Sequence, residues 1–339
     1  MVIFHLNAIS AAIAPTELAK AIEAESSKGI LLLTDLPKAP FTEIQAVSGL
    51  TSRPDISTRL NKAYSKNLVH KDSFANGKGG PNVDMKRVLD LSPERIEAIR
   101  KNDPDLQSLI EEGALGKSLA YWEDLRTGAA TKIARAVADA VGSEDVVTDV
   151  AFNYRMVDYY ERASCQDNID SEVAPRCGEH RDFGSFTLIF PSHAGFQVNV
   201  DGEWMDLEAV EEGSAILLFG WCTQIRSNGR IPALLHRVTD VEGITRRTSA
   251  VLFCAPKRDD TPLEPIVRAG EERVYISGIL AGQLRGSMRR KWQKREGTLN
   301  REGMILEEQE ILATNMMTQD DIVEYTVKSV ASLVAASAK

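Results

Sequence analysis

Apolar and polar residues follow one another along this chain in two patterns, and the pattern changes near residue 148. Before that point apolar residues recur at three- and four-residue spacing, which is typical of helices with one buried face. The spacing predicts helices over 15–28, 92–101 and 119–141, and an apolar run closed by proline predicts a buried strand over 29–37. The second of these helices has serine at its N-cap position and proline at its first helical position, which favours a helix start there.

Short runs of β-branched and aromatic residues dominate from about 148 to 256, where Gly, Asp, Asn and Pro separate them. The runs lie at 186–190, 196–200, 214–219 and 249–254. Many short strands at this spacing predict a β-sandwich or β-barrel. From about residue 271 the pattern returns to helix, and a last helix over 320–336 is interpreted either as a lid over a cavity or as an ordinary packed helix.

The two patterns together predict one domain, mainly β with helical flanks. We expect a mostly helical N-terminal part over 1–147, a β core over 148–257 and a helical C-terminal tail over 258–339. The chain has 339 residues, of which 43% are hydrophobic and 26% charged, so it can bury a sizeable core.

Charge and cysteine usage narrow the class of protein. The net charge of -9 argues against nucleic acid or an anionic membrane as the main partner, because both require concentrated Lys and Arg. The basic run 289–295 is interpreted as a solvated or ion-paired helix face. Four cysteines without a CxxC pair, no signal-peptide pattern and no apolar run near ~20 residues predict a cytoplasmic protein with reduced thiols. The pattern indicates no oligomeric state.

The segment His180-Arg181-Asp182 is the strongest candidate for chemistry, together with His236, which lies 54 positions after the aspartate. Alternate side chains of a strand share a face, so His180 and Asp182 can point at one centre while Arg181 points away. Two imidazoles and one carboxylate are the ligand set of non-haem iron(II) oxygenases. We therefore predict that these three residues bind iron and form the catalytic centre.

A second motif lies eleven residues past His236, at the start of another predicted strand, and contains Arg247 and Ser249. At a spacing of two, their side chains share a face and can bind one carboxylate, with the guanidinium acting as a charge-assisted fork. Such a pair suits the distal carboxylate of 2-oxoglutarate.

These motifs resemble those of the isopenicillin N synthase-like branch of the iron(II)/2-oxoglutarate-dependent oxygenases, and the resemblance is strongest from about 150 to 257. The matching blocks occur in the same order as in that branch: GGPNVDMK at 79–86, RMVDY at 155–159, GEHRDFG at 178–184, GFQVNVDGEW at 195–204, QIRSNGR at 224–230, LHRV at 235–238 and RTS at 247–249.

The resemblance implies a double-stranded β-helix (jelly-roll) core with Fe(II) bound inside one open end. It implies 2-oxoglutarate and dioxygen as co-substrates, ascorbate as a reductant in vitro, and release of succinate and carbon dioxide. It also implies that Tyr159 contributes a hydroxyl to 2-oxoglutarate, although the adjacent Tyr160 leaves the register open. The expected reaction is hydroxylation, desaturation or cyclisation at an unactivated C–H bond of a small molecule of secondary metabolism.

The sequence departs from the family near the predicted cavity rim, with Trp221 after Gly220 and Pro232-Ala233 before the distal histidine. Three residues are candidates for substrate contact, and an arginine in the cavity would favour an acidic substrate such as an amino acid. They are Arg155, Arg226 and Phe196.

Three other functions stay open at this point. An oxidase of the isopenicillin N synthase kind would use no 2-oxoglutarate, and Arg247 with Ser249 would then hold a substrate carboxylate. A jelly-roll protein that binds a small molecule beside a vestigial metal site belongs to a different class. A zinc hydrolase with the same ligands would need a general base, and the sequence identifies none.

Overall fold

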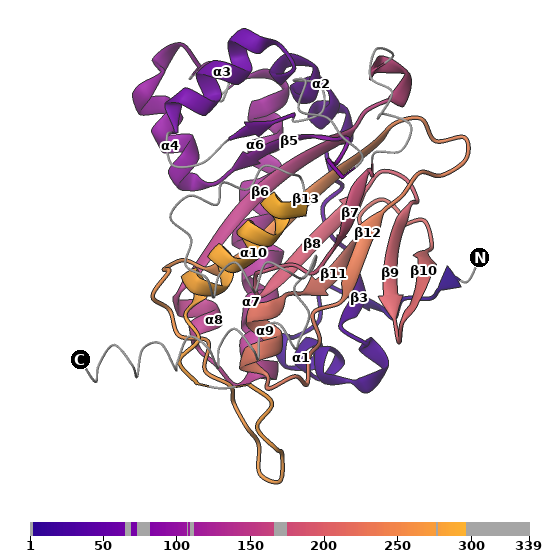
Figure 1. Cartoon of the computed structure of the whole chain (residues 1–339), viewed down its shortest axis with the longest axis vertical. Helices are drawn as coiled ribbons and strands as arrows, with labels where there is room; N and C mark the ends of the chain where they lie inside the picture. Colours follow the sequence, from indigo (N-terminus) through magenta and orange to yellow (C-terminus); the bar gives the residue numbers. More distant parts are fainter. Residues whose placement is uncertain are drawn as a thin grey trace.

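Two β-sheets face one another at the centre of the computed structural model, with helices outside them (Figure 1). The structure describes residues 3–64, 69–72, 82–106, 108, 112–165, 175–275 and 277–295. The fold is a jelly-roll of mixed sheets with flanking helices, which confirms the predicted fold class.

The larger sheet has eight strands, paired antiparallel except for its first pair. In spatial order they are β2 (Ala8–Ser10), β3 (Ile30–Thr34), β11 (Ala215–Phe219), β8 (Phe186–Pro191), β13 (Arg247–Pro256), β6 (Val150–Tyr159), β5 (Arg87–Leu91) and β4 (His70–Lys71). The smaller sheet has five strands: β1 (Ile3–Phe4), β10 (Glu203–Leu207), β9 (Phe196–Val200), β12 (Leu235–Val238) and β7 (Cys177–His180).

Both faces of the larger sheet are buried, and this explains why its central strands are almost continuously apolar. Tyr154 and Met156 of β6 point into the core beneath the helices, whereas Val157 and Tyr159 belong to the core between the two sheets. The inner core also receives residues of the smaller sheet, such as Val198. The inner face of the larger sheet therefore faces the space where a site between the sheets would lie.

Helices cover the outer face of the larger sheet and flank both ends (Figure 1). They are α1 (Pro15–Glu23), α2 (Phe41–Thr51), α3 (Pro54–Ala63), α4 (Pro93–Asn102), α6 (Gly113–Leu125), α7 (Thr131–Val141) and α8 (Asp145–Thr148). Two further helices, α9 (Trp221–Arg226) and α10 (Ala281–Arg295), share a separate apolar cluster. The start of α4 is as predicted, since the Ser92 hydroxyl accepts a hydrogen bond from the backbone N–H of Arg95 at 3.3 Å.

Four predictions about the elements need correction or stay open. The helix predicted over 119–141 begins earlier and is interrupted by a π-helical turn at Arg126–Ala130. The sequence pattern predicts an N-terminal part that is helical around one strand, but this part also supplies β1, β2, β4 and β5, most of which are too short to show alternation. The helix predicted over 320–336 lies outside the described residues, and the division at 147 and 257 stays a prediction.

Among the described residues, no helix has both the length and the apolarity that a membrane crossing requires. Cys177, Cys222 and Cys254 are buried free thiols.

Candidate metal centre

His180 and His236 lie opposite each other in adjacent strands of the smaller sheet, in the register that pairs β7 with β12. The Oδ1 atom of Asp182 is 3.6 Å from Nε2 of His180 and 3.9 Å from Nε2 of His236. One ligand atom from each residue lies within 4.8 Å of the others, close enough for a single ion. The predicted triad is therefore assembled in space.

The sequence suggested that strand alternation brings Asp182 to the site, but the structure places it there in another way. β7 ends at His180, and Asp182 lies in the turn that follows. The backbone carbonyl of Asp182 accepts a hydrogen bond at 2.9 Å from the N–H of Trp221, at the start of α9. This contact holds the turn, so a helix start fixes the carboxylate rather than a strand.

Each histidine is held in the tautomer that suits metal binding. Nδ1 of His180 is 2.8 Å from the carbonyl oxygen of Gly178, and Nδ1 of His236 is 3.0 Å from that of Leu234. Because a carbonyl only accepts, Nδ1 carries a proton in both rings, and Nε2 is the nitrogen that faces Oδ1 of Asp182. Burial, together with His236, lowers the pKa of His180 to about 3, so this imidazole is neutral.

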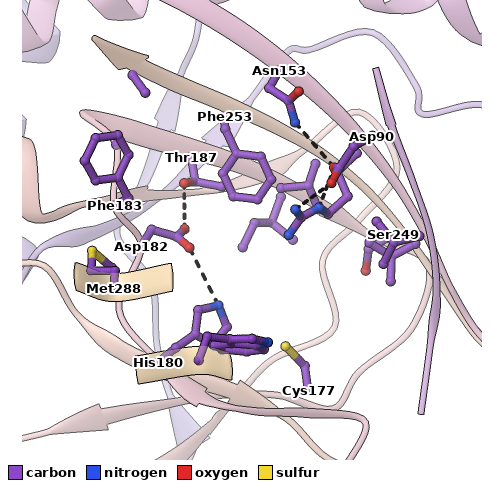
Figure 2. A pocket seen from close by; sticks show the side chains of 18 of the residues that line it. Asp90, Asn153, Cys177, His180, Asp182, Phe183, Thr187, Ser249, Phe253 and Met288 are labelled. Carbon is purple, nitrogen blue, oxygen red and sulfur yellow. Dashed lines mark hydrogen bonds and ion pairs between the residues drawn. The ribbon is translucent and has the colours of Figure 1, made fainter. Parts of the chain in front are cut away.

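The third ligand is oriented by Thr187 on β8, whose hydroxyl donates to Oδ2 of Asp182 at 2.6 Å (Figure 2). This bond leaves Oδ1 facing the two imidazoles. Burial alone would raise the pKa of Asp182, but His236, His180 and the threonine hydroxyl lower it below its usual value. The carboxylate is thus ionised, and its Oδ1 atom is oriented toward the two imidazoles, as a metal ligand must be.

Arg247 and Ser249 lie deeper in the same space, on the inner face of β13. Nη1 of Arg247 donates to the Ser249 hydroxyl at 2.8 Å, and Nε donates to the carbonyl of His193 at 3.1 Å. Nη2 of Arg247 is buried and has no hydrogen-bond partner among the described residues. A buried guanidinium N–H without a partner is costly, and a bound carboxylate would satisfy it.

Tyr159 completes this group, because β6 pairs with β13 so that Tyr159 lies opposite Arg247. The guanidinium carbon is 5.3 Å from the centroid of the Tyr159 ring. Burial raises the pKa of Tyr159 to about 12, so its hydroxyl is protonated and can donate. Tyr160 points elsewhere, since its hydroxyl donates to Asp72 at 3.1 Å. The register left open by the sequence therefore favours Tyr159.

A charged cluster that sequence reasoning missed lies beside His180. Nζ of Lys86 is 2.8 Å from Oδ2 of Asp84 and 2.9 Å from Sγ of Cys177. Asp84 also accepts from Nη2 of Arg295, at the end of α10, at 2.8 Å. Burial alone would raise the pKa of Asp84, but Lys86 and Arg295 lower it to about 2. The cluster joins α10 to the edge of the metal site.

One cavity of about 690 Å³ contains the triad, the Arg247 group and the inner side of α10. Phe196 lines it and stacks on His236, with ring centroids 5.3 Å apart. Trp292 of α10 packs edge-on against His180 at 5.2 Å. Figure 2 shows Phe183 and Met288 on the same side as Asp182. This volume is within the range for small-molecule sites.

The structure separates the two arginines predicted as substrate contacts. Arg155 lines the cavity, where it forms an ion pair with Asp90. Arg226 is not among the residues that line it; instead it is buried on α9, 3.7 Å from Asp145 and bonded to the carbonyl of Pro262. The prediction of a cavity role for Arg226 is therefore wrong, because a helix rather than a strand carries this residue away from the inner face.

Other cavity residues were missed, and some left a signal in the sequence. Asn153 shares the inner face of β6 with Arg155 at a spacing of two, and Phe253 follows Ser249 by four on β13. Thr187 and Asp90 come from other strands, so only the pairing of the sheet reveals them.

The fold and the triad together define a class. A jelly-roll with two imidazoles and one carboxylate at the end of a cavity is the arrangement of non-haem iron(II) oxygenases. Residues 151–256 match the family model described as the 2OG-Fe(II) oxygenase superfamily. These residues therefore form a 2OG-Fe(II) oxygenase domain.

Similar proteins are found by sequence and by structure. A feruloyl CoA ortho-hydroxylase of Arabidopsis thaliana is 30% identical over 109 residues, which cover 31% of this chain and 30% of that protein. A proline hydroxylase of Petromyces alliaceus is 34% identical over 119 residues, covering 32% and 37%. The match thus spans about a third of the length of these relatives.

Solved structures match over more of the chain. The rice dioxygenase for auxin oxidation has a TM-score of 0.63 at 19% identity, covering 88% of this chain and 98% of that one. A full-length Neurospora crassa protein in complex with alpha-KG has a TM-score of 0.58 at 19% identity, covering 86% and 96%. At such identity the likeness establishes the fold.

Proposed function

We propose that this protein is an iron(II)- and 2-oxoglutarate-dependent dioxygenase that oxidises a C–H bond of a small molecule. The observation that carries the proposal is the presence, in one cavity, of a buried His-Asp-His group and a buried arginine nitrogen without a partner among the described residues. The first suits iron(II) and the second suits the distal carboxylate of 2-oxoglutarate.

Each residue has a definite task in this proposal. His180, His236 and Asp182 would hold iron(II) through Nε2, Nε2 and Oδ1, and three coordination positions would stay open. Iron(II) with 2-oxoglutarate supplies dioxygen activation coupled to oxidative decarboxylation, which yields succinate and carbon dioxide.

The rest of the cavity positions the co-substrate and limits solvent. Arg247 donates through Nη2, and the hydroxyls of Ser249 and Tyr159 add two further donors to the same carboxylate. Phe196 and Trp292 pack on the two imidazoles and exclude water from their sides. The substrate then occupies the remaining volume toward Phe253 and Met288.

The kind of reaction and the metabolic role are finer proposals. Relatives named as hydroxylases favour hydroxylation of a small molecule over desaturation or ring closure. A relative named 1-aminocyclopropane-1-carboxylate oxidase, 30% identical over 100 residues, keeps an oxidase as the second candidate. We propose a role in secondary metabolism in the cytoplasm, with dioxygen and a small molecule as partners.

The proposal is tested by oxygen uptake with iron(II) and ascorbate across a panel of small metabolites, each with and without 2-oxoglutarate. We expect uptake that requires 2-oxoglutarate, yields succinate in step with it, and is lost in His180→Ala. Uptake of equal rate without 2-oxoglutarate would identify an oxidase instead. Absence of iron(II) binding under anaerobic, reducing conditions would favour the binding-protein interpretation.

A further inference from the structure

We propose that the substrate is a carboxylic acid with an apolar body, and that Arg155 binds its carboxylate in the outer part of the cavity. This inference rests on the proposed function and names the class of molecule that the same site accepts.

Arg155 lies on the inner face of β6, four residues before Tyr159 and opposite Val251 of β13. Since Ser249 and Tyr159 lie farther along this face, Arg155 is beyond the end of the proposed 2-oxoglutarate site. Burial alone would lower the pKa of Arg155, but Asp90 and, more weakly, Asp182 raise it, so the guanidinium stays charged. Arg155 is therefore placed to contact the substrate rather than 2-oxoglutarate.

The guanidinium is fixed on one edge and open on another. Nε of Arg155 donates to Oδ1 of Asp90 at 2.7 Å, and Nη2 donates to Oδ2 at 2.9 Å. Nη1 has no hydrogen-bond partner among the described residues, the side chain is 35% exposed, and the residue lines the cavity. The Nη1–Nη2 edge therefore offers two parallel N–H groups, which is the geometry that a carboxylate accepts in a bidentate pair.

Asp90 does not serve as a receptor for a substrate amine. Besides Arg155, it accepts from Nδ2 of Asn153 at 3.4 Å (Figure 2). One of its oxygens also lies 4.0 Å from Nη1 of Arg95. Its oxygens are directed at these donors, and two arginines against one aspartate leave the cluster with an excess positive charge. A simple acid fits this cluster better than an amino acid, whose ammonium group would face the arginines.

The charge of the cavity lining also favours an anionic substrate. Among the described residues, the lining contains ten Lys and Arg but five Asp and Glu, on a chain whose net charge is -9. Iron(II) and 2-oxoglutarate carry equal and opposite charges, so the excess remains when both are bound. A cleft of one sign raises the local concentration of ligands of the opposite sign.

Apolar side chains lie on one side of Arg155, and we expect the body of the substrate to pack against them. Its guanidinium carbon lies 4.9 Å from the centroid of the Phe253 ring. Phe183 and Met288 continue this apolar side toward Asp182 (Figure 2). An acid whose carboxylate is on Arg155 would therefore place its hydrocarbon part along these residues, toward the triad.

The test compares matched acids and amides by calorimetry on the anaerobic protein loaded with iron(II) and 2-oxoglutarate. The probes are cinnamate with cinnamamide, 3-phenylpropionate with its amide, and decanoate with decanamide. We expect at least one acid to bind about tenfold or more tightly than its amide, the effect of a charge-assisted pair. Equal binding of every acid and its amide, or no binding of any acid, would overturn the proposal.

Variants assign that preference to one residue. In Arg155→Gln the preference for the acid should fall to about twofold or less, while 2-oxoglutarate binds as before. The double variant Arg155→Gln/Asp90→Asn removes both charges, so it tests the same point without leaving a carboxylate unpaired. Arg53→Gln removes an exposed arginine paired with Asp55 and serves as the control of equal charge change. A preference that survives in both Arg155 variants contradicts the proposal.

The outcome is independent of the oxygenase assignment. Should the protein form no succinate with any compound, the proposed function fails, yet the binding of acids over amides is still measured. Should succinate form with amides and acids alike, the function stands and the substrate class is wrong.

Discussion

Arg247 and Tyr159 lie directly opposite each other in the pairing of β13 with β6, with the guanidinium carbon 5.3 Å from the ring centroid. The ring borders a guanidinium that already donates to Ser249 and to the carbonyl of His193. Only Nη2 is left without a partner among the described residues. The pair thus forms a preorganised receptor for one carboxylate, with its donors fixed before binding.

We expect Arg247→Ala to raise the dissociation constant for 2-oxoglutarate about 100-fold, because a buried charge-assisted pair is lost. Calorimetry on the anaerobic iron(II) protein measures it. Arg247→Lys keeps the charge but not the fork, so it should recover only part of the affinity. Unchanged 2-oxoglutarate binding in Arg247→Ala, with substrate binding lost instead, would support the oxidase.

The adjacent tyrosines provide a matched comparison. Tyr159→Phe should raise the KM for 2-oxoglutarate about tenfold, since one hydrogen bond to a charged group is removed. Tyr160→Phe removes the same atom from a side chain that bonds Asp72, and it should leave this KM unchanged. Steady-state kinetics of both variants decide the register, and the opposite result would transfer the role to Tyr160.

Thr187 positions a proposed metal ligand through its 2.6 Å bond to Oδ2 of Asp182. Thr187→Val keeps the shape but removes the hydroxyl, and we expect iron(II) affinity to fall about 10- to 100-fold. Thr187→Ser restores the hydroxyl and should restore most of the affinity. Competition with a chromogenic chelator under anaerobic conditions measures both. Equal iron affinity in the valine and serine variants would show that Asp182 needs no such partner.

The site was more predictable than its surroundings, for a physical reason. His180, Asp182, His236, Arg247 and Ser249 all lie in one cavity, as their chemistry and spacing indicated. Metal binding and carboxylate binding need particular residue types at short spacings, so their motifs can be recognised in a sequence. Contacts between distant strands have no such motif, because they depend on the sheet register that only the folded chain defines.

Asp90, Thr187 and Lys86 illustrate the second case. Asp90 and Thr187 reach the cavity from segments with no motif of their own. Lys86 ends the block at 79–86, but its contact with Cys177 depends on the folded chain. The error on Arg226 has the same origin. The sequence does not show whether the segment after Gly220 continues a strand or starts a helix, and α9 turns this side chain away from the cavity.

Asp84 is buried between Lys86 and Arg295, and it also accepts from the backbone N–H of Gly178 at 2.9 Å. Asp84→Asn leaves two cations beside a neutral amide, so we expect the free energy of unfolding to fall by about 3–5 kcal/mol. Urea denaturation measures it. Arg295→Gln, which removes one cation and keeps the pair of Lys86 with Asp84, should cost much less. Equal losses in the two variants would contradict a central role for this carboxylate.

His70 gives a pH dependence whose sign follows from its surroundings. It is 3% exposed, and Nδ1 lies 2.8 Å from the Ser57 hydroxyl. Burial, followed by the charge of Arg87, lowers its pKa to about 4, although Asp72 acts in the opposite direction. In the unfolded chain the pKa is about 6.5. Between these values the unfolded chain binds a proton that the folded protein excludes.

The free energy of unfolding should therefore be fully retained above pH 6.5 and should fall as the pH drops toward 4, by about 2–3 kcal/mol from this residue. His70→Gln removes the proton site, so the difference in stability between wild type and variant should shrink over this window. His5→Gln changes an exposed histidine and is the control. Urea denaturation at several pH values measures all three proteins. A difference between wild type and His70→Gln that stays constant from pH 7 to pH 4.5 would show that His70 is protonated equally in both states, and hence that burial does not exclude its charge.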